Sequence, residues 1–364
     1  MKNTFGNNVS ITLFGESHGT AIGAVIDGLP AGICVDEEFI AHQLDLRRPV
    51  GKISTPRKEA DKCNIVSGVF NGKTTGTPIC IVIPNENTQS KDYSQTYGKA
   101  RPGHADYTAY CKYNGCEDYR GGGHFSGRIT AGLVAAGAIA IATLAKKGIR
   151  IGTHISKCAG VEDAAFNDLG KDVIALSNKL FAVLSDEKGE QMIKNIEAAA
   201  QAGDSVGGVL ETVVTGLPVG VGEPWFDSVE SVLSHALFSI PAIKGVEFGA
   251  GFACADMLGS QMNDSFVTEN GIVATKTNNN GGINGGITNG MPVVFKCAVK
   301  PTPSIGKEQA TIDFINNENA TISIKGRHDP CIVHRARVVV DSVTALVLCD
   351  LLSQKFGTDW LGEE

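Results

Sequence analysis

The first fifty residues alternate between β-like and helix-like patterns of apolar positions. Val9–Phe14 and Ala21–Ile26 are short apolar runs that predict two strands, and the Asp-Gly-Leu-Pro sequence after the second run predicts a turn. Asp36 is a candidate N-cap for a helix over Glu37–Arg47, because apolar residues then recur at helical spacing until Pro49 ends the pattern. We therefore expect a hairpin followed by an amphipathic helix.

Polar and glycine-rich segments separate the later apolar elements. We expect a long loop over Val82–Arg101 and a buried helix over about Ile129–Lys147, which Gly148 ends. The second half predicts helices near Asp172–Leu184, Glu187–Gln201, Ser228–Phe238 and Pro330–Phe356, and strands at Val209–Thr215 and Pro292–Val299. Regular alternation of strands and helices is missing, which argues against a doubly wound parallel sheet.

Two segments of the chain resemble each other. GAVIDGLPAG at 23–32 and ETVVTGLPVG at 211–220 share Gly-Leu-Pro-x-Gly. Each is followed by a capped helix, further strands, a glycine-rich loop and a long apolar helix, as expected of an internal repeat. This order predicts two related halves, roughly 1–150 and 205–360. No Pro/Ser-rich linker separates them, so we expect a single domain over 1–364 with internal pseudosymmetry.

Composition narrows the class of protein. Of the 364 residues, 42% are apolar and 20% charged, which is typical of a globular protein, and the net charge of −7 without a basic run argues against nucleic-acid binding. The ten cysteines include no CxxC pair, so we expect free thiols, no metal site and a cytoplasmic location. We expect neither a signal peptide nor a membrane span, because the most apolar run, Ile129–Ala145, is short for one.

Three reactive types of side chain lie together in Gly15-Glu16-Ser17-His18-Gly19. The sequence matches G-x-S-x-G, the nucleophile elbow of α/β-hydrolases, which would make Ser17 a nucleophile. That motif requires a helix directly after the serine, and the residues that follow here are β-like, so we disfavour a hydrolase. A solvated turn is the structural alternative, because turns collect serine and acidic residues.

Three further segments combine glycine or proline with groups that bind anions. RPGHAD (Arg101–Asp106) places His104 before an acid able to orient or charge the imidazole. GGGHFSGR (Gly121–Arg128) sets a glycine loop before a helix, where backbone N–H groups suit a phosphate or an electron-rich ring. Ser126 in that loop either caps the helix or contacts the ligand. In KPTPS (Lys300–Ser304), two prolines fix a loop that is rich in anion-binding side chains, with a rigid solvent-facing turn as the alternative.

The last two candidates lie at helix ends. Asp329 before Pro330 predicts an N-cap, but the neighbouring histidine and cations of KGRHDP would also suit proton transfer. Arg47 and Arg48 either interact with the C-terminal dipole of their helix or hold an anionic substrate. From the residues alone, we expect an enzyme or a binding protein for a phosphorylated small molecule.

The order of these motifs resembles that of the chorismate synthase family. FGESHG, RPGHAD, GGGHFSGR, HALFSIPAIKGVEFG, the NNNGG…GG loop, KPTPSI and GRHDPC follow one another over essentially the whole chain. The resemblance implies the last step of the shikimate pathway, in which 5-enolpyruvylshikimate-3-phosphate loses phosphate and a C6 proton by anti-1,4-elimination to give chorismate. It implies a need for reduced FMN, an α+β fold in which long helices lie between two antiparallel sheets (a β-α-β sandwich), and a homotetramer.

The resemblance also implies roles for individual residues. His18 matches an acid near the leaving phosphate, and His104 matches a group that protonates or stabilises the reduced flavin. Asp329 matches an aspartate that helps the flavin N5 to take up the substrate proton. FMN contacts are implied at His124, Phe125, Ser126, Pro241, Ala242, Gly285, Lys300, Pro301, Thr302, Pro303, Ser304 and Arg327. Contacts with substrate or NADP are implied at Arg47, Arg48, Arg101, Arg128 and Arg335.

The chain departs from the family pattern at several positions. His124-Phe125-Ser126-Gly127-Arg128 stands where Arg-Ser-Ser-Ala-Arg is common, so backbone contacts with flavin are expected there more than side-chain contacts. Asp341 stands where glutamate is usual, and Ile53 lies near a second usual arginine, which weakens an NADP assignment. A non-catalytic flavin-binding protein of the same fold would lack the proton-transfer groups, which this chain has. With no reductase domain apparent, we expect reduced flavin from an external source.

Overall fold

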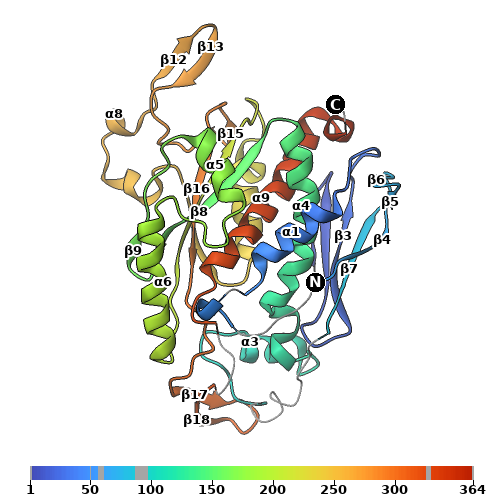
Figure 1. The fold of residues 1–364 in the computed structure, drawn as a ribbon, viewed down its shortest axis with the longest axis vertical. Helices are drawn as coiled ribbons and strands as arrows, with labels where there is room; N and C mark the ends of the chain where they lie inside the picture. Colours follow the sequence, from blue (N-terminus) through green and yellow to red (C-terminus); the bar gives the residue numbers. More distant parts are fainter. Residues whose placement is uncertain (1, 50, 56–60, 87–96, 325–328, 363–364) are drawn as a thin grey trace.

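The computed structural model describes residues 2–49, 51–55, 61–86, 97–324 and 329–362, and it places helices between two antiparallel sheets (Figure 1). The first sheet has the order β1-β2-β3-β7-β4 and the second β11-β16-β10-β8-β9. The strands of the first are β1 (Thr4–Phe5), β2 (Ser10–Gly15), β3 (Ala21–Asp27), β7 (Ile79–Pro84) and β4 (Asn64–Ser67). Those of the second are β11 (Ile243–Phe248), β16 (Val293–Val299), β10 (Gly208–Thr215), β8 (Arg150–Cys158) and β9 (Val161–Glu162).

Four helices fill the space between the sheets. They are α1 (Glu37–Arg47), α4 (Thr130–Lys146), α7 (Val229–Ser239) and α9 (Val333–Phe356). α4 packs on β3, α9 packs on β8, and the two helices pack on each other. A Cβ on Gly137 of α4 would lie 2.6 Å from the Cα atom of Ser342 on α9, so this contact is close because Gly137 has no side chain.

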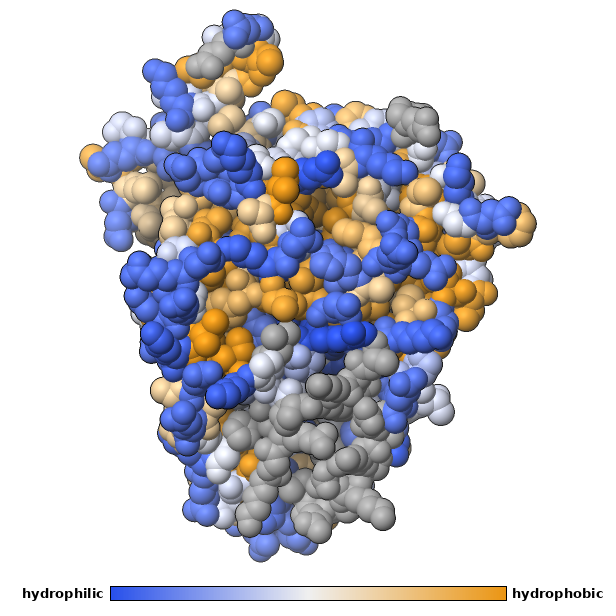
Figure 2. Space-filling view, in the orientation of Figure 1, coloured by the Kyte–Doolittle hydropathy of each residue, from blue (hydrophilic) through white to orange (hydrophobic). Residues whose placement is uncertain are grey.

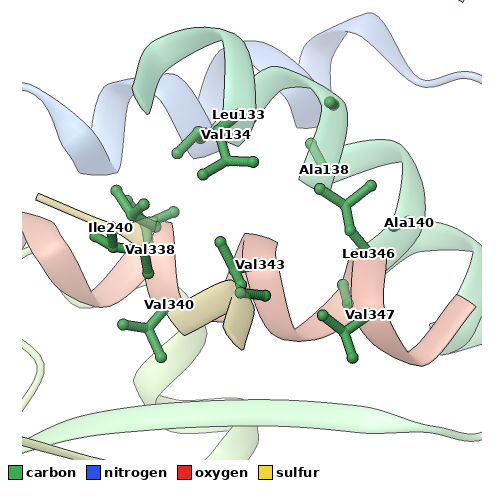
Figure 3. Close-up of a cluster of buried hydrophobic side chains, with 14 of the residues drawn as sticks. Leu133, Val134, Ala138, Ala140, Ile240, Val338, Val340, Val343, Leu346 and Val347 are labelled. Carbon is green, nitrogen blue, oxygen red and sulfur yellow. The ribbon is translucent and has the colours of Figure 1, made fainter. Parts of the chain in front are cut away.

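The central helices supply a large part of the hydrophobic core, and the inner faces of the two sheets supply much of the rest. Figure 3 shows Val134 and Ala138 of α4 facing Val343 and Leu346 of α9 across their interface. The segment Gly127–Lys146 has the length and the apolar composition of a helix that could cross a membrane, but 72% of it is buried inside the protein. The prediction of a buried helix here is confirmed.

The outer elements complete the layers. α5 (Leu169–Ser177) covers β8 on the face away from α9, because Gly152 contacts Val173 of α5 while the next residue, Thr153, bonds to Asp341 of α9. The other helices are α3 (Asp106–Tyr113), α6 (Asp186–Gln201), α8 (Gly259–Met262), η1 (Gly51–Ile53), η2 (Arg120–Phe125), η3 (Gly127–Ile129), η4 (Trp225–Asp227), η5 (Gly251–Asp256) and η6 (Thr358–Leu361). Short hairpins pair β5 (Val69–Phe70) with β6 (Lys73–Thr74), β12 (Phe266–Glu269) with β13 (Ile272–Thr275), β14 (Ile283–Asn284) with β15 (Ile287–Thr288), and β17 (Gln309–Asp313) with β18 (Glu318–Ile322).

The two sheets share one order of connections. The elements β2-β3-α1-β4-β7-α4 of the first half correspond to β8-β10-α7-β11-β16-α9 of the second. Within the sheets, β2-β3-β7-β4 corresponds to β8-β10-β16-β11. The Gly-Leu-Pro sequences follow β3 and β10, which are equivalent strands. The fold has the sandwich architecture that the resemblance implies and an internal repeat, but the second half begins with β8 at Arg150 and not near residue 205 as predicted.

Several predicted boundaries differ from the structure. α1 begins after Asp36, whose carboxylate accepts a hydrogen bond from the Phe39 N–H at 2.9 Å, as predicted. The loop expected from Val82 is wrong at its start, because Val82 to Pro84 belong to β7, and residues 87–96 lie outside the described part of the chain. The last helix begins at Val333, so the prediction that Asp329 caps it is also wrong.

Candidate active site

The described residues enclose a cavity of about 1300 Å³ beside the N-terminal ends of α4 and α9. Typical small-molecule sites measure roughly 300–1,000 Å³. Its lining residues come from β2, the glycine loop at 121–127, α7, α9 and the loop at 300–304. The cavity therefore has room for more than one small ligand.

The charge of this cavity opposes that of the whole chain. Nine lysine and arginine side chains line it against five aspartates and glutamates, although the chain as a whole carries a net charge of −7. The cationic residues are Lys2, Arg47, Arg48, Lys99, Arg101, Arg128, Lys244, Lys300 and Arg335. A cavity lined by positive charge attracts anionic ligands, such as molecules that carry phosphate or carboxylate groups.

His18 lies where the turn after β2 meets the glycine loop. The Ser17 N–H donates to the carbonyl oxygen of Gly123 at 3.1 Å, which joins the two segments. Gly121 has φ +60°, and a Cβ there would lie 2.8 Å from Nε2 of His18 and 3.0 Å from Oγ of Ser17. The glycine thus allows backbone to approach the buried imidazole, which no other residue could do without displacing it.

His104 meets a carboxylate and a guanidinium group at the same ring nitrogen. Its Nδ1 is 2.8 Å from Oδ1 of Asp106 and 3.1 Å from Nη2 of Arg101. Burial alone would raise the pKa of Asp106, but hydrogen bonds from Arg101 and His104 outweigh burial and lower it below the usual range. Asp106 therefore remains a carboxylate near neutral pH.

Asp329 reaches the cavity from the segment before α9. Its Oδ1 accepts a hydrogen bond from the Thr55 N–H at 2.7 Å, and its Oδ2 lies 2.7 Å from Nη2 of Arg335. The Thr302 hydroxyl donates to its carbonyl oxygen, which ties the loop at 300–304 to the same place. These contacts replace the predicted helix cap, because the carboxylate points toward the site instead of toward the N–H groups of α9.

Asp61 connects two of the predicted arginines. Arg47 lies 3.3 Å from its Oδ2, and Arg128 pairs with its Oδ1. Arg47 also donates to the Thr130 hydroxyl at 2.9 Å and to the Gly127 carbonyl at 2.7 Å, so it holds the start of α4. Sequence reasoning missed Asp61, and no local pattern marks it, because both partners are distant along the chain. Arg48 also lines the cavity and pairs with Asp45.

The side chains of the glycine loop contact both β2 and the loop itself. Nδ1 of His124 lies 2.7 Å from the Gly15 carbonyl, which holds the ring against β2. The Ser126 hydroxyl accepts from the Arg128 N–H at 3.2 Å, so it is a helix cap, one of the two roles expected for it. The Phe125 side chain is 39% exposed and meets Tyr113 edge to face. All three residues line the cavity.

A second group of predicted residues lines the cavity from the other half of the chain. The Lys300 ammonium group donates to the Gly103 carbonyl, and Ser304 Oγ lies 3.4 Å from Nη1 of Arg101. Ala242 has a positive φ of 77°, and its carbonyl accepts from the Lys300 N–H at 2.9 Å. The lining residues of this group are Pro241, Ala242, Lys300, Thr302, Pro303 and Ser304.

Two predicted flavin contacts do not line the cavity, and a third falls outside the described residues. Gly285 occupies the turn of the β14–β15 hairpin and does not line it. Pro301 points toward Gly207, whose Cβ would lie 3.0 Å from the proline ring, because side chains of the extended loop alternate in direction. Arg327 lies outside the described residues.

Comparison with known proteins shows which family has this sequence and this fold. The family model for chorismate synthase matches residues 9–353. The chain belongs to the chorismate synthase family. A protein named chorismate synthase from Dehalococcoides mccartyi is 48% identical over 355 residues, covering 96% of each chain. Another from Thermococcus kodakarensis is 45% identical over 351 residues, covering 96% of this chain and 97% of its own.

A solved structure agrees with this membership. The crystal structure of a chorismate synthase superposes with a TM-score of 0.76 at 30% sequence identity, covering 97% of this chain and 94% of its own. The chain is therefore an enzyme, a carbon–oxygen lyase of the shikimate pathway that forms chorismate. The hydrolase interpretation of Gly15–Gly19 is excluded by the same findings. The family uses reduced flavin.

Proposed function

We propose that the cavity binds 5-enolpyruvylshikimate-3-phosphate beside reduced FMN and expels phosphate from it to form chorismate. The observation that carries this proposal is the meeting of His18, His104 and Asp329 in one space that is lined by an excess of cations. The substrate carries a phosphate and two carboxylates, which suit such a cavity. A non-catalytic flavin-binding protein would have no use for three proton-transfer groups in one cavity.

Two features of the cavity support flavin binding. Gly121 and Gly122 line it with their backbone close against His18 and His104, so no Cβ stands between the loop and either ring. The buried hydroxyl of Ser17 has no hydrogen-bond partner among the described residues. The residues that would hold FMN are His124, Phe125, Ser126, Pro241, Ala242, Lys300, Thr302, Pro303 and Ser304. When bound, reduced FMN would lend electron density to the substrate as phosphate leaves.

The side chains of this protein then manage protons and charge. His18 donates a proton toward the leaving phosphate, and His104 holds a proton at the flavin edge. The Asp329 carboxylate, oriented by Thr55 and Arg335, helps to accept the proton lost from C6. The elimination thus removes one proton and one phosphate, and it leaves the oxidation state of the substrate unchanged.

The arginines neutralise the anionic groups. Arg48, Arg101 and Arg335 extend to the cavity, and Arg47 and Arg128 share Asp61 at its wall. A guanidinium group can bind phosphate or carboxylate through two parallel hydrogen bonds. We infer that these five residues hold the substrate, that NADP has no dedicated site, and that reduced flavin comes from outside.

We further infer that the enzyme is a homotetramer in the cytoplasm, without a nucleic-acid or membrane partner. The β12–β13 hairpin projects from the body (Figure 1), and Figure 2 shows apolar side chains on it. Phe266, Ile272 and Val273 are 65%, 70% and 58% exposed. An exposed apolar group of this kind is typical of a surface that another subunit covers.

An anaerobic assay tests the proposed function. The pure protein is mixed with 5-enolpyruvylshikimate-3-phosphate and chemically reduced FMN, and chorismate and phosphate are followed together. We expect equimolar products with reduced FMN, none with oxidised FMN, and loss of turnover but retained flavin binding after His18→Ala or His104→Ala. Full rates in both variants would contradict the assigned roles. Flavin binding without any product would favour a binding protein, and activity driven by NADPH alone would overturn the external source of reduction.

A further inference from the structure

We propose that Asp106 is a positioning residue that keeps the neutral His104 ring protonated on Nδ1, so that Nε2 is the ring nitrogen that takes up a proton and returns it at the ligand. The inference rests on the proposed role of His104 in the cavity. In this proposal, Asp106 determines which of the two ring nitrogens of His104 exchanges protons with the ligand.

The Asp106 carboxylate is held at four points. Its Oδ1 lies 2.8 Å from Nδ1 of His104 and 2.7 Å from Nη2 of Arg101. Its Oδ2 accepts from Nε of Arg101 at 2.8 Å and from the Arg101 N–H at 3.0 Å. Asp106 is also the first residue of α3, where the helix dipole favours a negative charge. The carboxylate is therefore fixed in place and ionised.

The neighbours of Nδ1 make the tautomer depend on Asp106. An ionised carboxylate only accepts hydrogen bonds, so it favours a proton on Nδ1. Nη2 of Arg101, 3.1 Å from the same nitrogen, is a donor and favours the opposite tautomer, in which Nδ1 accepts. Asp106 is the closer of the two and is negatively charged, so its preference prevails.

The His104 ring lines the cavity, and its side chain is 18% exposed. The backbone of Gly122 approaches Nε2 closely, since a Cβ there would lie 3.3 Å from this nitrogen. With Nδ1–H bonded to Asp106, the Nε2 lone pair is directed away from the carboxylate, to the side of the ring where Gly122 also lines the cavity. The ring can then take up a proton on Nε2 and return it without losing its Nδ1 partner, as in other histidine–carboxylate pairs.

Asp106→Asn tests the assignment. The amide can donate to Nδ1, as Arg101 does, so the proton should move to Nε2 and the neutral ring should lose its acceptor. We expect ¹⁵N NMR of histidine-labelled, ligand-free protein at pH 8.5 to show Nδ1–H in the parent and Nε2–H in the variant. The His104 signals are identified by their loss in His104→Ala. The kcat for chorismate formation should fall by roughly 10²-fold to 10⁴-fold.

Matched variants separate this role from other effects of losing a charge. Asp186 is the first residue of α6 and pairs with Nζ of Lys179 at 2.8 Å, so Asp186→Asn removes the same charge from the same helix position and should leave kcat unchanged. Asp106→Glu restores a carboxylate and should restore the Nδ1–H tautomer with part of the rate. In a His104→Ala background, Asp106→Asn should have no further effect on kcat.

Several results would overturn the proposal. One is an Nε2–H tautomer of His104 in the parent protein, which does not require Asp106→Asn to fold. Another is an unchanged tautomer in Asp106→Asn. A third is an equal fall in kcat with and without His104, which would show that Asp106 acts through Arg101. The NMR result does not depend on turnover, so a parent protein that makes no chorismate would contradict the proposed function and leave the tautomer test intact.

Discussion

At the scale of single residues, Gly121 controls how closely backbone approaches His18. Its φ is +60°, and a Cβ at this position would lie 2.8 Å from Nε2 of His18, so Gly121→Ala should displace the ring. A misplacement of about 1 Å costs roughly 10²-fold in rate. We expect kcat/KM for chorismate formation to fall by about that factor in an anaerobic assay.

Gly127→Ala is the matched control for this prediction. Gly127 lines the same cavity, but a Cβ there meets nothing within 4 Å. We expect near-parent rates from it. Equal losses in the two variants would mean that the loop responds to any added methyl group, and that the contact with His18 is not the cause.

The carboxylates around the buried His154 ring predict a contribution to stability that depends on pH. Its Nδ1 lies 2.8 Å from Asp163, and its Nε2 lies 2.9 Å from Glu211, which also pairs with Lys296. Burial alone would lower the pKa of His154, but the two carboxylates outweigh burial and raise it. A raised pKa in the folded state stabilises the protein below the unfolded value of about 6.5, and this contribution is lost as the pH rises through the folded pKa.

Chemical unfolding at several pH values checks this sign. The difference in free energy of unfolding between the parent protein and His154→Gln should be about 1–3 kcal/mol near pH 6 and should shrink as the pH rises. Asp163 and Glu211 have lowered pKa values, so their part of the cluster is lost on acidification instead. A difference that grows with pH would contradict the assigned charge of His154.

The sequence was sufficient to locate those site residues that lie within short, recognisable motifs. His18 and His104 each adjoin a glycine within recognisable motifs, and the structure brings both to one cavity with Asp329. Asp61 could not be found in this way, because its partners Arg47 and Arg128 are distant in sequence and no pattern encodes a non-local ion pair. The chemical roles of these residues stay predictions until the variants are assayed.

At the scale of elements, the contact between α4 and α9 depends on Gly137. A helix interior normally gains roughly 1 kcal/mol when glycine is replaced by alanine. Here the new methyl group would lie 2.6 Å from Cα of Ser342, so α4 and α9 would have to separate. We expect Gly137→Ala to lower the free energy of unfolding by about 1–3 kcal/mol, the usual cost of overpacking, as measured by chemical denaturation.

Gly170→Ala in α5 supplies the comparison. The nearest atom to a Cβ at Gly170 is Oδ1 of Asp168 at 3.5 Å, an ordinary contact. This variant should be neutral or slightly stabilising. If both variants stabilise the protein, the two central helices have more freedom than their packing indicates.

Local capping patterns predicted the start of one helix correctly and the start of another incorrectly. α1 has a capping aspartate and an apolar face, and its predicted bounds agree with the structure. The Asp329-Pro330 pair carries an equally good capping signal, but α9 begins at Val333. The Thr55 N–H and the Arg335 side chain bond to the Asp329 carboxylate instead. Thr55 is 274 residues away in sequence, so a local capping pattern could not reveal this contact.

At the scale of the whole molecule, the sequence repeat was visible because equivalent turns carry the same residues. The Gly-Leu-Pro sequences after β3 and β10 mark equivalent strands of the two sheets. The strand order within each sheet was not visible, because pairing depends on contacts between strands that are far apart in sequence. The sandwich architecture therefore came from the family resemblance, and the repeat came from the residues themselves.

The last prediction concerns assembly. Ile272 on the β12–β13 hairpin is 70% exposed, and burying an isoleucine contributes roughly 1.5–3 kcal/mol. If another subunit covers the hairpin, Ile272→Asp would place a charge in each interface, and we expect the tetramer to separate into smaller species with unchanged circular dichroism. Light scattering after size-exclusion chromatography measures the mass. Ile174→Asp is the control, because Ile174 on α5 is 65% exposed and lies outside the hairpin. A tetramer that survives Ile272→Asp would show that the subunits meet elsewhere.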